Sequence, residues 1–394
     1  MDAIKRLVAD AASSLTALRR DLHRHPELGR QERRTSALIE EVLKNLGLDV
    51  KRVTGTGLSA VLKGGRPGPT LLLRADLDAL PVQEATGLPY ASETPGVMHA
   101  CGHDGHAAIL TTAARLLTGC ADRLGGSIKF VFEPNEEEVG ALAMIEEGVL
   151  SDPDVTAAAG LHLWAPLEFG KIAVDDGATW AGMDHFLIKV RGRGGHTASP
   201  HLAVDPILAA AQIVNGVQAL SSRELDPFLP FSLVFGRIQG GSAANVIPAE
   251  VELEGTIRYL FDGADDGPHR PRARFKELAE RLAAAFRAEA EVVFYCSQPP
   301  LINDPAMAAL GRAAAVRTLG SAEGLAQCRN LGGEDFSEFS RRVPSVFAVI
   351  GAGSVESGAV HPHHNEKFRL DERALAVGLE WLLRTSLAYL ETTL

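Results

Sequence analysis

Cysteine is scarce in this chain, which argues against a fold built on disulfides. The 394 residues contain four cysteines, spread widely as Cys101, Cys120, Cys296 and Cys328. Disulfide frameworks need more cysteines at closer spacing. Residues 1–6 also lack the apolar stretch of a secretory signal peptide. We therefore expect a protein of the reducing cytoplasm.

Positive charge and long apolar runs are lacking as well. The 39 Lys and Arg residues are outnumbered by 50 Asp and Glu residues, which gives a formal net charge of −11. A general nucleic-acid-binding protein needs a basic stripe, so we expect no such partner. No run approaches the ~18 apolar residues of a membrane span, so we expect no membrane partner. The composition, 46% hydrophobic and 23% charged, is that of a globular enzyme, and the length favours two domains.

The most informative segment is the run 101–106, Cys-Gly-His-Asp-Gly-His. It combines a thiol, two imidazoles and a carboxylate, which are ligand types that divalent metals accept. Glycine lets the backbone turn tightly, and residues two apart in an extended segment point the same way. We predict that Cys101 and His103 form a metal-binding pair on a loop. A buried cysteine with surface histidines is the alternative.

Further candidate ligands follow along the chain. The acidic run 136–138 comes after the strand-like run 128–132, and α/β enzymes place chemistry at strand ends. Adjacent carboxylates suit a division of labour in which one binds metal and the other acts as a base, although acidic runs are usually solvated surface. His162 lies in an apolar segment, where a histidine is more often a satisfied core residue. Three histidines, His361, His363 and His364, cluster near the C-terminus.

A series of short motifs runs in order along nearly the whole chain. They lie at residues 22–28 (Leu-His-Arg-His-Pro-Glu-Leu), 74–81 (Arg-Ala-Asp-Leu-Asp-Ala-Leu-Pro), 99–106, 134–137 (Pro-Asn-Glu-Glu), 160–162 (Gly-Leu-His), 194–196 (Gly-Gly-His), 245–248 (Asn-Val-Ile-Pro), 255–258 (Gly-Thr-Ile-Arg) and 333–336 (Gly-Glu-Asp-Phe). Together they resemble the amidohydrolase branch of the binuclear metal aminoacylase and carboxypeptidase family. That branch includes N-acyl-amino-acid, hippurate and auxin-conjugate hydrolases.

The resemblance implies two divalent metal ions per subunit, which could be zinc, manganese, cobalt or nickel. The implied ligands are Cys101, which would bridge the metals, His103, Glu137, His162 and His364. Alignment on the downstream aromatic and acidic residues of the motif selects His364, and His361 is the second choice.

The resemblance also assigns the general base to Glu136. The acidic run reads Glu-Glu-Glu where relatives have Glu-Glu-Gly, so Glu137 and Glu138 are the alternative pair of base and ligand. Asp78 is expected to contact and orient His103; a helix cap or turn former is its alternative role.

Three more residues are implied in the second half of the chain. His196 would reach the active site of a partner subunit and stabilise the oxyanion that forms when water attacks an amide. Asn245 and Arg258 would lie near the same cleft. Arginine suits a substrate carboxylate because its planar fork forms two hydrogen bonds. A structural salt bridge is the competing role for Arg258.

The expected fold is α/β: a largely parallel-sheet, zinc-exopeptidase-like catalytic domain with an inserted ferredoxin-like α+β dimerisation (lid) domain. The catalytic domain comprises residues 1–182 and 298–394, and the insertion comprises residues 183–297. In the catalytic domain, periodicity predicts helices at 36–46 and 107–117 and strands at 58–62 and 70–73. In the insertion we predict strands at 186–190, 232–238, 250–259 and 291–295, helices at 206–220 and 275–288, and a surface loop at 262–271.

The expected function is metal-dependent hydrolysis of N-acyl-L-amino acids, such as N-acetyl, N-benzoyl or similar aryl or indole acyl conjugates. Water activated by metal would attack the amide, with Glu136 as general base, in a homodimer or higher homo-oligomer. The alternatives are a metal-dependent carboxypeptidase or dipeptidase and a p-aminobenzoyl-glutamate-type hydrolase. A thiol peptidase that uses Cys101 and a non-catalytic metal-binding protein on the same fold are the rivals from other classes.

Overall fold

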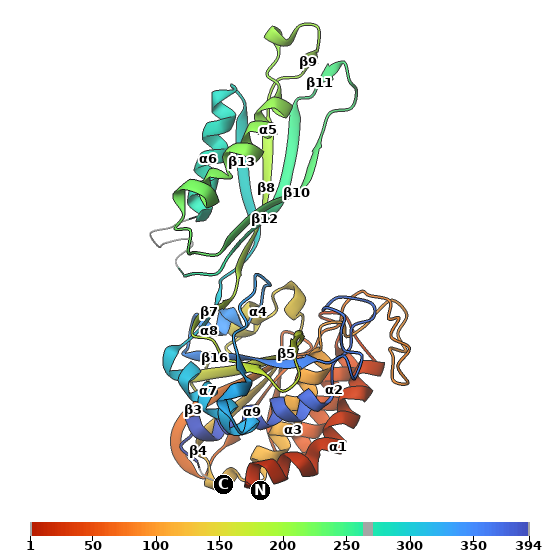
Figure 1. The fold of residues 1–394 in the computed structure, drawn as a ribbon, viewed down its shortest axis with the longest axis vertical. Coiled ribbons are helices and arrows are strands. Elements are labelled where there is room, and N and C mark those ends of the chain that lie inside the picture. The colour runs from red at the N-terminus through yellow and green to blue at the C-terminus, as the bar shows by residue number, and fades with distance from the viewer. Residues whose placement is uncertain (1, 263–270, 393–394) are drawn as a thin grey trace. The chain divides into compact units, whose positions relative to one another are not determined.

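The computed structural model describes residues 2–262 and 271–392, and the chain divides into two compact units (Figure 1). Unit 1 comprises residues 1–177, 302–329 and 335–394, and unit 2 comprises residues 178–301 and 330–334. The domain bounds predicted from the sequence stay predictions. The catalytic role expected for one domain and the dimerisation role expected for the other also stay predictions. No helix in the described part of the chain is long and apolar enough to cross a bilayer.

Unit 1 is built on an eight-stranded sheet in the order β1-β2-β4-β3-β5-β16-β6-β15. The strands are β1 (Asp49–Val53), β2 (Gly57–Lys63), β3 (Arg66–Asp76), β4 (Gly125–Glu133), β5 (Ala157–Glu168), β6 (Ile172–Ala173), β15 (Leu325–Ala326) and β16 (Ser345–Gly353). The strands β4, β3, β5 and β16 run parallel. Their apolar side chains, such as Leu71, Phe130 and Ile350, are fully buried, and each such side chain contributes about 1.5–3 kcal/mol.

The sheet is mixed: its central strands are parallel, as predicted, and antiparallel pairs that the prediction did not specify lie to either side of them. β1 pairs antiparallel with β2, β2 pairs antiparallel with β4, and β6 pairs antiparallel with β16. The physical reason at this edge is the short connection between β1 and β2. A connection of a few residues can join antiparallel neighbours, whereas a parallel pair needs a long crossover.

The helices of unit 1 pack on the central strands and on one another. They are α1 (Ala3–Arg24), α2 (Arg33–Asn45), α3 (His103–Thr118), α4 (Ala141–Glu146), α7 (Pro305–Leu319), α8 (Ser337–Ser340) and α9 (Arg373–Tyr389). α3 contacts β3 and β5, α9 contacts β5 and β16, and α1 contacts both of these helices (Figure 1). The predicted helix at 36–46 is confirmed by α2, and the predicted strands at 58–62 and 70–73 are confirmed by β2 and β3.

The helix predicted at 107–117 begins four residues earlier than expected. Gly102 takes a left-handed conformation with φ 93° and serves as the N-cap, so the α-helix begins at His103. His103 is therefore on the first turn of α3, and the prediction that it lies on a loop with Cys101 was wrong. A non-glycine residue would be strained at this turn, which explains why glycine separates the two side chains.

Unit 2 holds a four-stranded antiparallel sheet in the order β10-β12-β8-β13. In chain order its main elements are β8 (Gly182–Arg191), α5 (Pro206–Gly216), β10 (Phe231–Gly240), β12 (Glu250–Tyr259), α6 (Pro271–Ala285) and β13 (Glu289–Gln298). This strand-helix-strand-strand-helix-strand order is the predicted ferredoxin-like order. α5 and α6 lie side by side on one face of the sheet (Figure 1).

The elements of unit 2 form where they are predicted, but β8, β10 and β13 extend beyond the predicted ranges at both ends, and α6 spans Pro271–Ala285 where 275–288 is predicted. The helix predicted at 206–220 ends as an α-helix at Gly216, and a π-helical turn follows at residues 220–224. Most of the predicted loop at 262–271 lies outside the described residues. The smaller strands are β9 (Gly195–His196), β11 (Val246–Ile247), β7 (Gly177–Trp180) and β14 (Leu301–Asn303).

Candidate metal centre

The candidate ligands of unit 1 converge at the carboxyl ends of the central parallel strands. Asp76 ends β3, Glu133 ends β4, and His162 lies on β5, while Cys101 and His103 stand at the start of α3. The carboxyl ends of parallel strands in α/β sheets are the usual location of ligand sites. Residues far apart in sequence therefore meet at one edge of the sheet.

The His103 ring is aimed into this site by a carboxylate. Its Nδ1 lies 3.2 Å from Oδ1 of Asp78, and Asp78 also accepts a hydrogen bond from the backbone N–H of Glu137 at 3.1 Å. The ring is buried, and its Nε2 has no hydrogen-bond partner among the described residues. This nitrogen lies 3.8 Å from Oε2 of Glu136 and 4.0 Å from Oε1 of Glu137. A buried lone pair that faces two carboxylates suits a cation between them.

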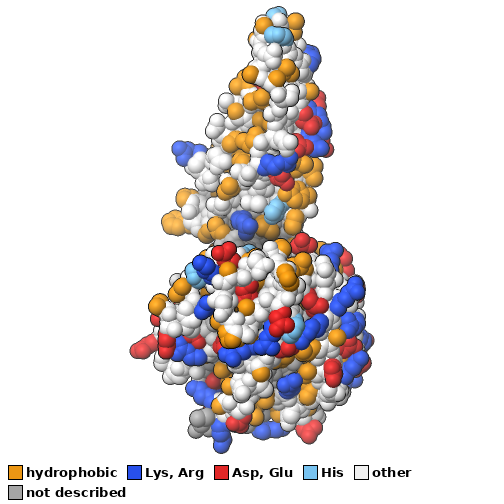
Figure 2. Space-filling model, turned by 90° about the vertical axis from the view of Figure 1, so that its right-hand side faces the viewer, with side chains coloured by type: hydrophobic (Ala, Val, Ile, Leu, Met, Phe, Trp, Pro, Cys, Tyr) orange, Lys and Arg blue, Asp and Glu red, His pale blue; other side chains and the backbone are white. Residues whose placement is uncertain are grey.

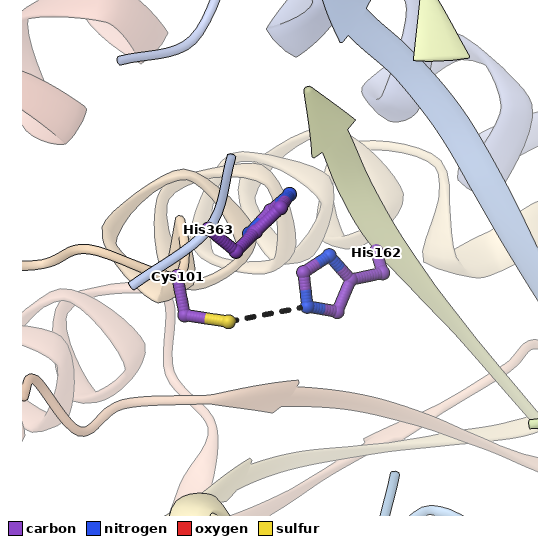
Figure 3. Close-up of side chains that lie close together, drawn as sticks. All are labelled: Cys101, His162 and His363. Carbon is purple, nitrogen blue, oxygen red and sulfur yellow. Dashed lines mark hydrogen bonds between the residues drawn. The ribbon is translucent and has the colours of Figure 1, made fainter. Parts of the chain in front are cut away.

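A thiol and a second imidazole form the neighbouring part of the site (Figure 3). Sγ of Cys101 lies 3.6 Å from Nε2 of His162. The Nδ1 of His162 lies 2.9 Å from the carbonyl oxygen of Leu163, so this nitrogen carries the proton and donates it. The Nε2 lone pair of His162 is thereby left facing the thiol. The two side chains come from the α3 N-terminus and from β5, and together they present one sulfur and one nitrogen.

The C-terminal histidines lie at different distances from these groups. His364, with φ 64°, places its Nε2 3.3 Å from Oε1 of Glu137, and it forms a compact donor group with Cys101 and Glu137. His363 accepts a hydrogen bond through Nε2 from the backbone N–H of Ala165 at 3.1 Å. Its ring also groups with Cys101 and His162 (Figure 3). His361 belongs to none of the donor groups found in residues 2–262 and 271–392.

The donor groups share members, which is the arrangement that two nearby cations require. Glu137 belongs both to the group with Cys101 and His364 and to the group with His103 and Glu136. Within each group the ligand atoms lie within 4.8 Å of one another. Glu138 is exposed and belongs to no such group in the described chain. The arrangement of thiol, imidazole and carboxylate fits borderline-soft divalent metals.

The electrostatics of the site favour a bound cation. Hydrogen bonds to Cys101 and Glu137 raise the pKa of His364 to about 10. Burial lowers the pKa of His103, but Asp76 and Cys101 outweigh it and hold that pKa well above its usual value. Burial, and then the negative charge of Glu137, raise the pKa of the Cys101 thiol. These groups hold protons where negative charge accumulates, and a divalent cation would replace those protons.

Sequence reasoning assigned no role to a second pair of residues, Asp76 and His106. Oδ1 of Asp76 lies 2.7 Å from Nδ1 of His106, and Nε2 of His106 accepts a hydrogen bond from the backbone N–H of Leu163 at 2.9 Å. His106 is thereby held beside the His162 ring, with 4.6 Å between ring centroids. The sequence does contain a pattern that points to Asp76: it alternates with Arg74 and Asp78, and residues two apart in a strand face the same side.

The candidates of unit 2 do not come together within one copy of that unit. His196 pairs with Val246 across β9 and β11, so His196 and Asn245 are neighbours. Arg258 lies near the far end of β12, opposite Met183. At about 3.3 Å per residue, the eight steps from Glu250 to Arg258 span roughly 26 Å. Within one copy the long strand β12 therefore separates Asn245 from Arg258, and their expected place near one cleft shared with a partner subunit stays a prediction.

Known proteins resemble this chain over most of its length. A model of the family described as Peptidase family M20/M25/M40 matches residues 72–388. The chain is 39% identical over 363 residues to N-acetyl-L-cysteine deacetylase of Bacillus subtilis (strain 168), covering 92% of this chain and 84% of that protein. It is 41% identical over 304 residues to N-acyl-L-amino acid amidohydrolase of Geobacillus stearothermophilus, covering 76% and 80%. The crystal structure of the Bacillus subtilis YXEP protein, described as a dinuclear metal binding peptidase from the M20 family, superposes with a TM-score of 0.84 at 34% identity, covering 98% of this chain and 100% of that one.

Proposed function

The chain belongs to peptidase family M20/M25/M40 and is a metal-dependent hydrolase; from that premise we propose that it cleaves the amide bond of N-acyl-L-amino acids. The products would be a carboxylic acid and a free amino acid. One observation carries the proposal: the buried Nε2 of His103, which has no hydrogen-bond partner among the described residues, faces the carboxylates of Glu136 and Glu137 beside a thiol and two further imidazoles.

The proposed ligands are Cys101, His103, Glu137, His162 and His364. Two divalent ions held there, whether zinc, manganese, cobalt or nickel, would supply the positive charge that activates water and polarises the amide carbonyl. Asp78 fixes the His103 ring so that Nε2 points inward. His364 is preferred to His363 because the Nε2 of His363 is already occupied by the backbone N–H of Ala165.

Glu136 is the proposed general base. Its carboxylate shares a donor group with His103 and Glu137, and it lies outside the group formed by Cys101, Glu137 and His364. A carboxylate beside the proposed metal ligands can accept a proton from water and later give it to the leaving nitrogen. Transfer of that proton allows the amine to leave as a free amino acid.

The thiol of Cys101 is a poor candidate for a nucleophile. A thiol peptidase needs a thiolate, which requires a lowered thiol pKa. Burial and the charge of Glu137 instead raise the pKa of Cys101. The thiol is also surrounded by further donor groups, which a Cys-His nucleophile does not need. Ligation to a cation is the role that this environment supports, since a coordinating thiol is deprotonated by the metal itself.

His196 is proposed to donate a hydrogen bond to the oxyanion. Its Nδ1 accepts a hydrogen bond from the backbone N–H of Ala198 at 2.9 Å, so the proton of a neutral ring is on Nε2. The side chain is exposed, and Nε2–H is therefore available as a donor to a group outside its own unit.

A homodimer is the proposed assembly, and β10 is the edge that supports it. β10 is at one end of the four-stranded sheet, and its apolar residues Val234 and Ile238 are 55% and 62% exposed. Ile207 and Leu208 at the start of α5 are also exposed, and Ile207 lies near the end of β10 at Gly241. Figure 2 shows hydrophobic side chains gathered on the visible face of unit 2. An open edge with an apolar border needs a partner, and a second copy would pair it in a two-fold interface.

Arg258 is proposed to bind the α-carboxylate of the substrate. Its guanidinium donates a hydrogen bond to the carbonyl oxygen of Leu331 at 2.7 Å, and it forms no ion pair with any described residue. Burial lowers the pKa of this arginine. A partly buried cation without an acidic partner favours anion binding over the competing structural salt bridge.

The function is tested by a hydrolysis panel of N-acetyl, N-benzoyl, indole-acyl and p-aminobenzoyl amino acids, with the metal content measured on the same preparation. We expect turnover of N-acyl amino acids that depends on the metal and is lost on chelation. Turnover confined to dipeptides or to p-aminobenzoyl-glutamate would contradict the proposed substrate class and support the alternatives from the same family.

The role of Arg258 is tested by comparing each substrate with its α-amide. Loss of the carboxylate should lower kcat/KM roughly 10- to 100-fold, because charged hydrogen bonds are lost. Equal kcat/KM for acid and amide would remove Arg258 from this role.

The four cysteines are free, which agrees with a reducing compartment, and we propose the cytoplasm on that basis.

A further inference from the structure

The guanidinium of Arg74 is buried and contacts three carboxylates at once. Its Nε lies 2.7 Å from Oε2 of Glu133, one terminal nitrogen lies 2.8 Å from Oδ2 of Asp76, and the other lies 2.7 Å from Oδ1 of Asp335. All four side chains are almost completely buried. Burying so many charged groups is costly, so the arrangement needs a reason beyond core packing.

One arm of this network leads to the proposed base. The other oxygen of Asp335, Oδ2, accepts a hydrogen bond from the backbone N–H of Ala141 at 2.9 Å. The backbone N–H of Asp335 itself points to Oε1 of Glu136 at 3.5 Å. Asp335 therefore touches the Glu136 carboxylate and also holds the chain just after the Glu136–Glu138 turn.

That turn has left-handed backbone at both ends and is strained at Val139. Asn135 and Val139, which flank it, have φ values of 61° and 62°. A β-branched residue such as valine is a genuine outlier in the left-handed region, at a cost of about 1–3 kcal/mol. Strain of this kind persists only when the surroundings hold it. Before the turn, Glu32 accepts a hydrogen bond from the backbone N–H of Asn135 at 2.9 Å, and after it Asp335 binds Ala141.

We propose that Asp335, anchored by Arg74, is a positioning residue that holds the strained turn and thereby sets the place of the Glu136 carboxylate. The assignment rests on the proposed function, because it takes Glu136 as the base. It adds a residue 199 positions away in the sequence whose side chain binds Arg74 and the backbone N–H of Ala141. Arg74, which anchors Asp335, also contacts Asp76, so Asp335 and Asp76 belong to one buried network.

The chemistry of Asp335 suggests a conservative variant. Burial, and then the neighbouring Glu133, raise the pKa of Asp335 well above its usual range. An asparagine keeps the shape and one of the two oxygen acceptors, which can still accept the hydrogen bond from the backbone N–H of Ala141 while its NH2 stands in the place of the other oxygen. Asp335→Asn should therefore keep the contact that holds the turn and lose the one with Arg74, whereas Asp335→Ala removes both contacts.

The test compares these two variants with Arg384→Met, which breaks a buried ion pair with Glu380 in the same unit but away from the turn. We expect Asp335→Ala to lower kcat about 100-fold, since small misplacements of catalytic groups have such effects. Its KM and metal content should stay near those of the wild type, and Asp335→Asn and Arg384→Met should keep kcat within about threefold. If Asp335→Ala does not fold, Asp335→Ser, which is too short to bridge Arg74 and Ala141, replaces it.

Crystal structures of the Asp335 variants provide a readout that needs no substrate. We expect Glu136 to move relative to His103 in Asp335→Ala and to superpose in Asp335→Asn. A wild-type protein that hydrolyses nothing in the panel would contradict the proposed function. The position of Glu136 in the variant structures would still show whether Asp335 is a positioning residue. The inference is overturned by an unmoved Glu136 in Asp335→Ala, by full kcat in that variant, or by an equal loss in Arg384→Met.

Discussion

Two adjacent carboxylates at the centre of the site face different partners. Glu137 approaches both His364 and His103, whereas Glu136 approaches His103 and the backbone N–H of Asp335. Both carboxylates belong to the group with His103, but only Glu137 also belongs to the group with Cys101 and His364. This difference is the physical basis for proposing Glu137 as a ligand and Glu136 as the base.

Glu136→Gln should keep the fold and the metal but lose hydrolysis. The amide is nearly isosteric and cannot accept the proton, and general-base catalysis contributes about 10²- to 10⁴-fold. Steady-state kinetics with elemental analysis of the same preparation measures the effect. Glu138→Gln is the matched control, because Glu138 is exposed and in no donor group of the described chain, and it should be nearly silent. Near-normal turnover of metal-loaded Glu136→Gln would move the base assignment to Glu137.

His364→Ala should lower metal occupancy more than His361→Ala does. His364 lies 3.3 Å from the Glu137 carboxylate, while His361 has no place in the donor groups of the described residues. Elemental analysis after dialysis against a weak chelator gives the order of the two variants. The opposite order would show that the C-terminal ligand was placed on the wrong histidine.

The sequence was enough to select candidate metal ligands, because their residue types are typical of metal sites. It could not reveal residues whose role depends on tertiary contacts. Cys101, His103 and His364 stand out because thiol and imidazole are rare and clustered. Arg74 and Asp335 lie 261 residues apart, and only the folded sheet places them 2.7 Å from each other. His363 was treated as a neighbour of the ligand, because no spacing rule shows that its ring accepts the Ala165 N–H.

At the scale of elements, α1 is fastened to the start of α3 by a buried ion pair. Nε of Arg19 lies 2.8 Å from Oδ2 of Asp104, and Nδ1 of His23 lies 2.7 Å from the same oxygen. Oδ1 of Asp104 accepts a hydrogen bond from the backbone N–H of Gly105 at 2.9 Å. The pair therefore connects the first helix to the turn that carries His103.

Arg19→Met should lower the free energy of unfolding by about 3–5 kcal/mol, because it leaves a buried carboxylate without its main partner. Arg20→Met is the control on the same helix. Arg20 pairs with Glu372 but is 44% exposed, so its loss should cost about 0–1 kcal/mol. Denaturant unfolding near neutral pH measures both values. Similar losses for the two variants would show that burial does not decide the strength of this contact.

The contribution of the Arg19 pair should also depend on pH. Burial raises the pKa of Asp104, but Arg19 and His23 outweigh it and hold that pKa well below the usual value of 3.8. A group whose pKa is lower in the folded state stabilises the fold above its unfolded pKa and loses that effect as pH falls. The difference between wild type and Arg19→Met should be full at neutral pH and shrink below about pH 4.

Element boundaries were predictable where the residue pattern alone determines them. β12 spans residues 250–259 as predicted, because apolar residues alternate with polar ones along it. The sequence did not predict the start of α3, because its N-cap is a left-handed glycine and no polar N-cap side chain marks the beginning of the helix. The antiparallel edge of the sheet was missed for a related reason: strand direction is set by connections and neighbours, which a strand's own pattern does not encode.

At the scale of the whole molecule, the separation of the unit 2 candidates is informative. His196 and Asn245 lie beyond the start of β12, and Arg258 lies near its end, roughly 26 Å away along the strand. One copy of unit 2 cannot present both ends to one small substrate. A second copy can, if one subunit contributes His196 and the other contributes Arg258, and this requirement favours the proposed dimer.

Mixed dimers of two inactive variants test whether sites are shared. Glu136→Gln lacks the base, and His196→Ala lacks the oxyanion donor, so each homodimer should be poorly active. If His196 acts in the partner's site, a mixed dimer contains one site with both groups intact and one site with neither. Activity of co-assembled, purified mixed dimers should then return to about half that of the wild type. Ile238→Lys, which puts a charge on the exposed edge strand, should yield monomers that behave like His196→Ala in turnover, whereas Val293→Lys on β13 should stay dimeric. Verified mixed dimers with no recovered activity would place His196 in its own subunit's chemistry, or outside catalysis.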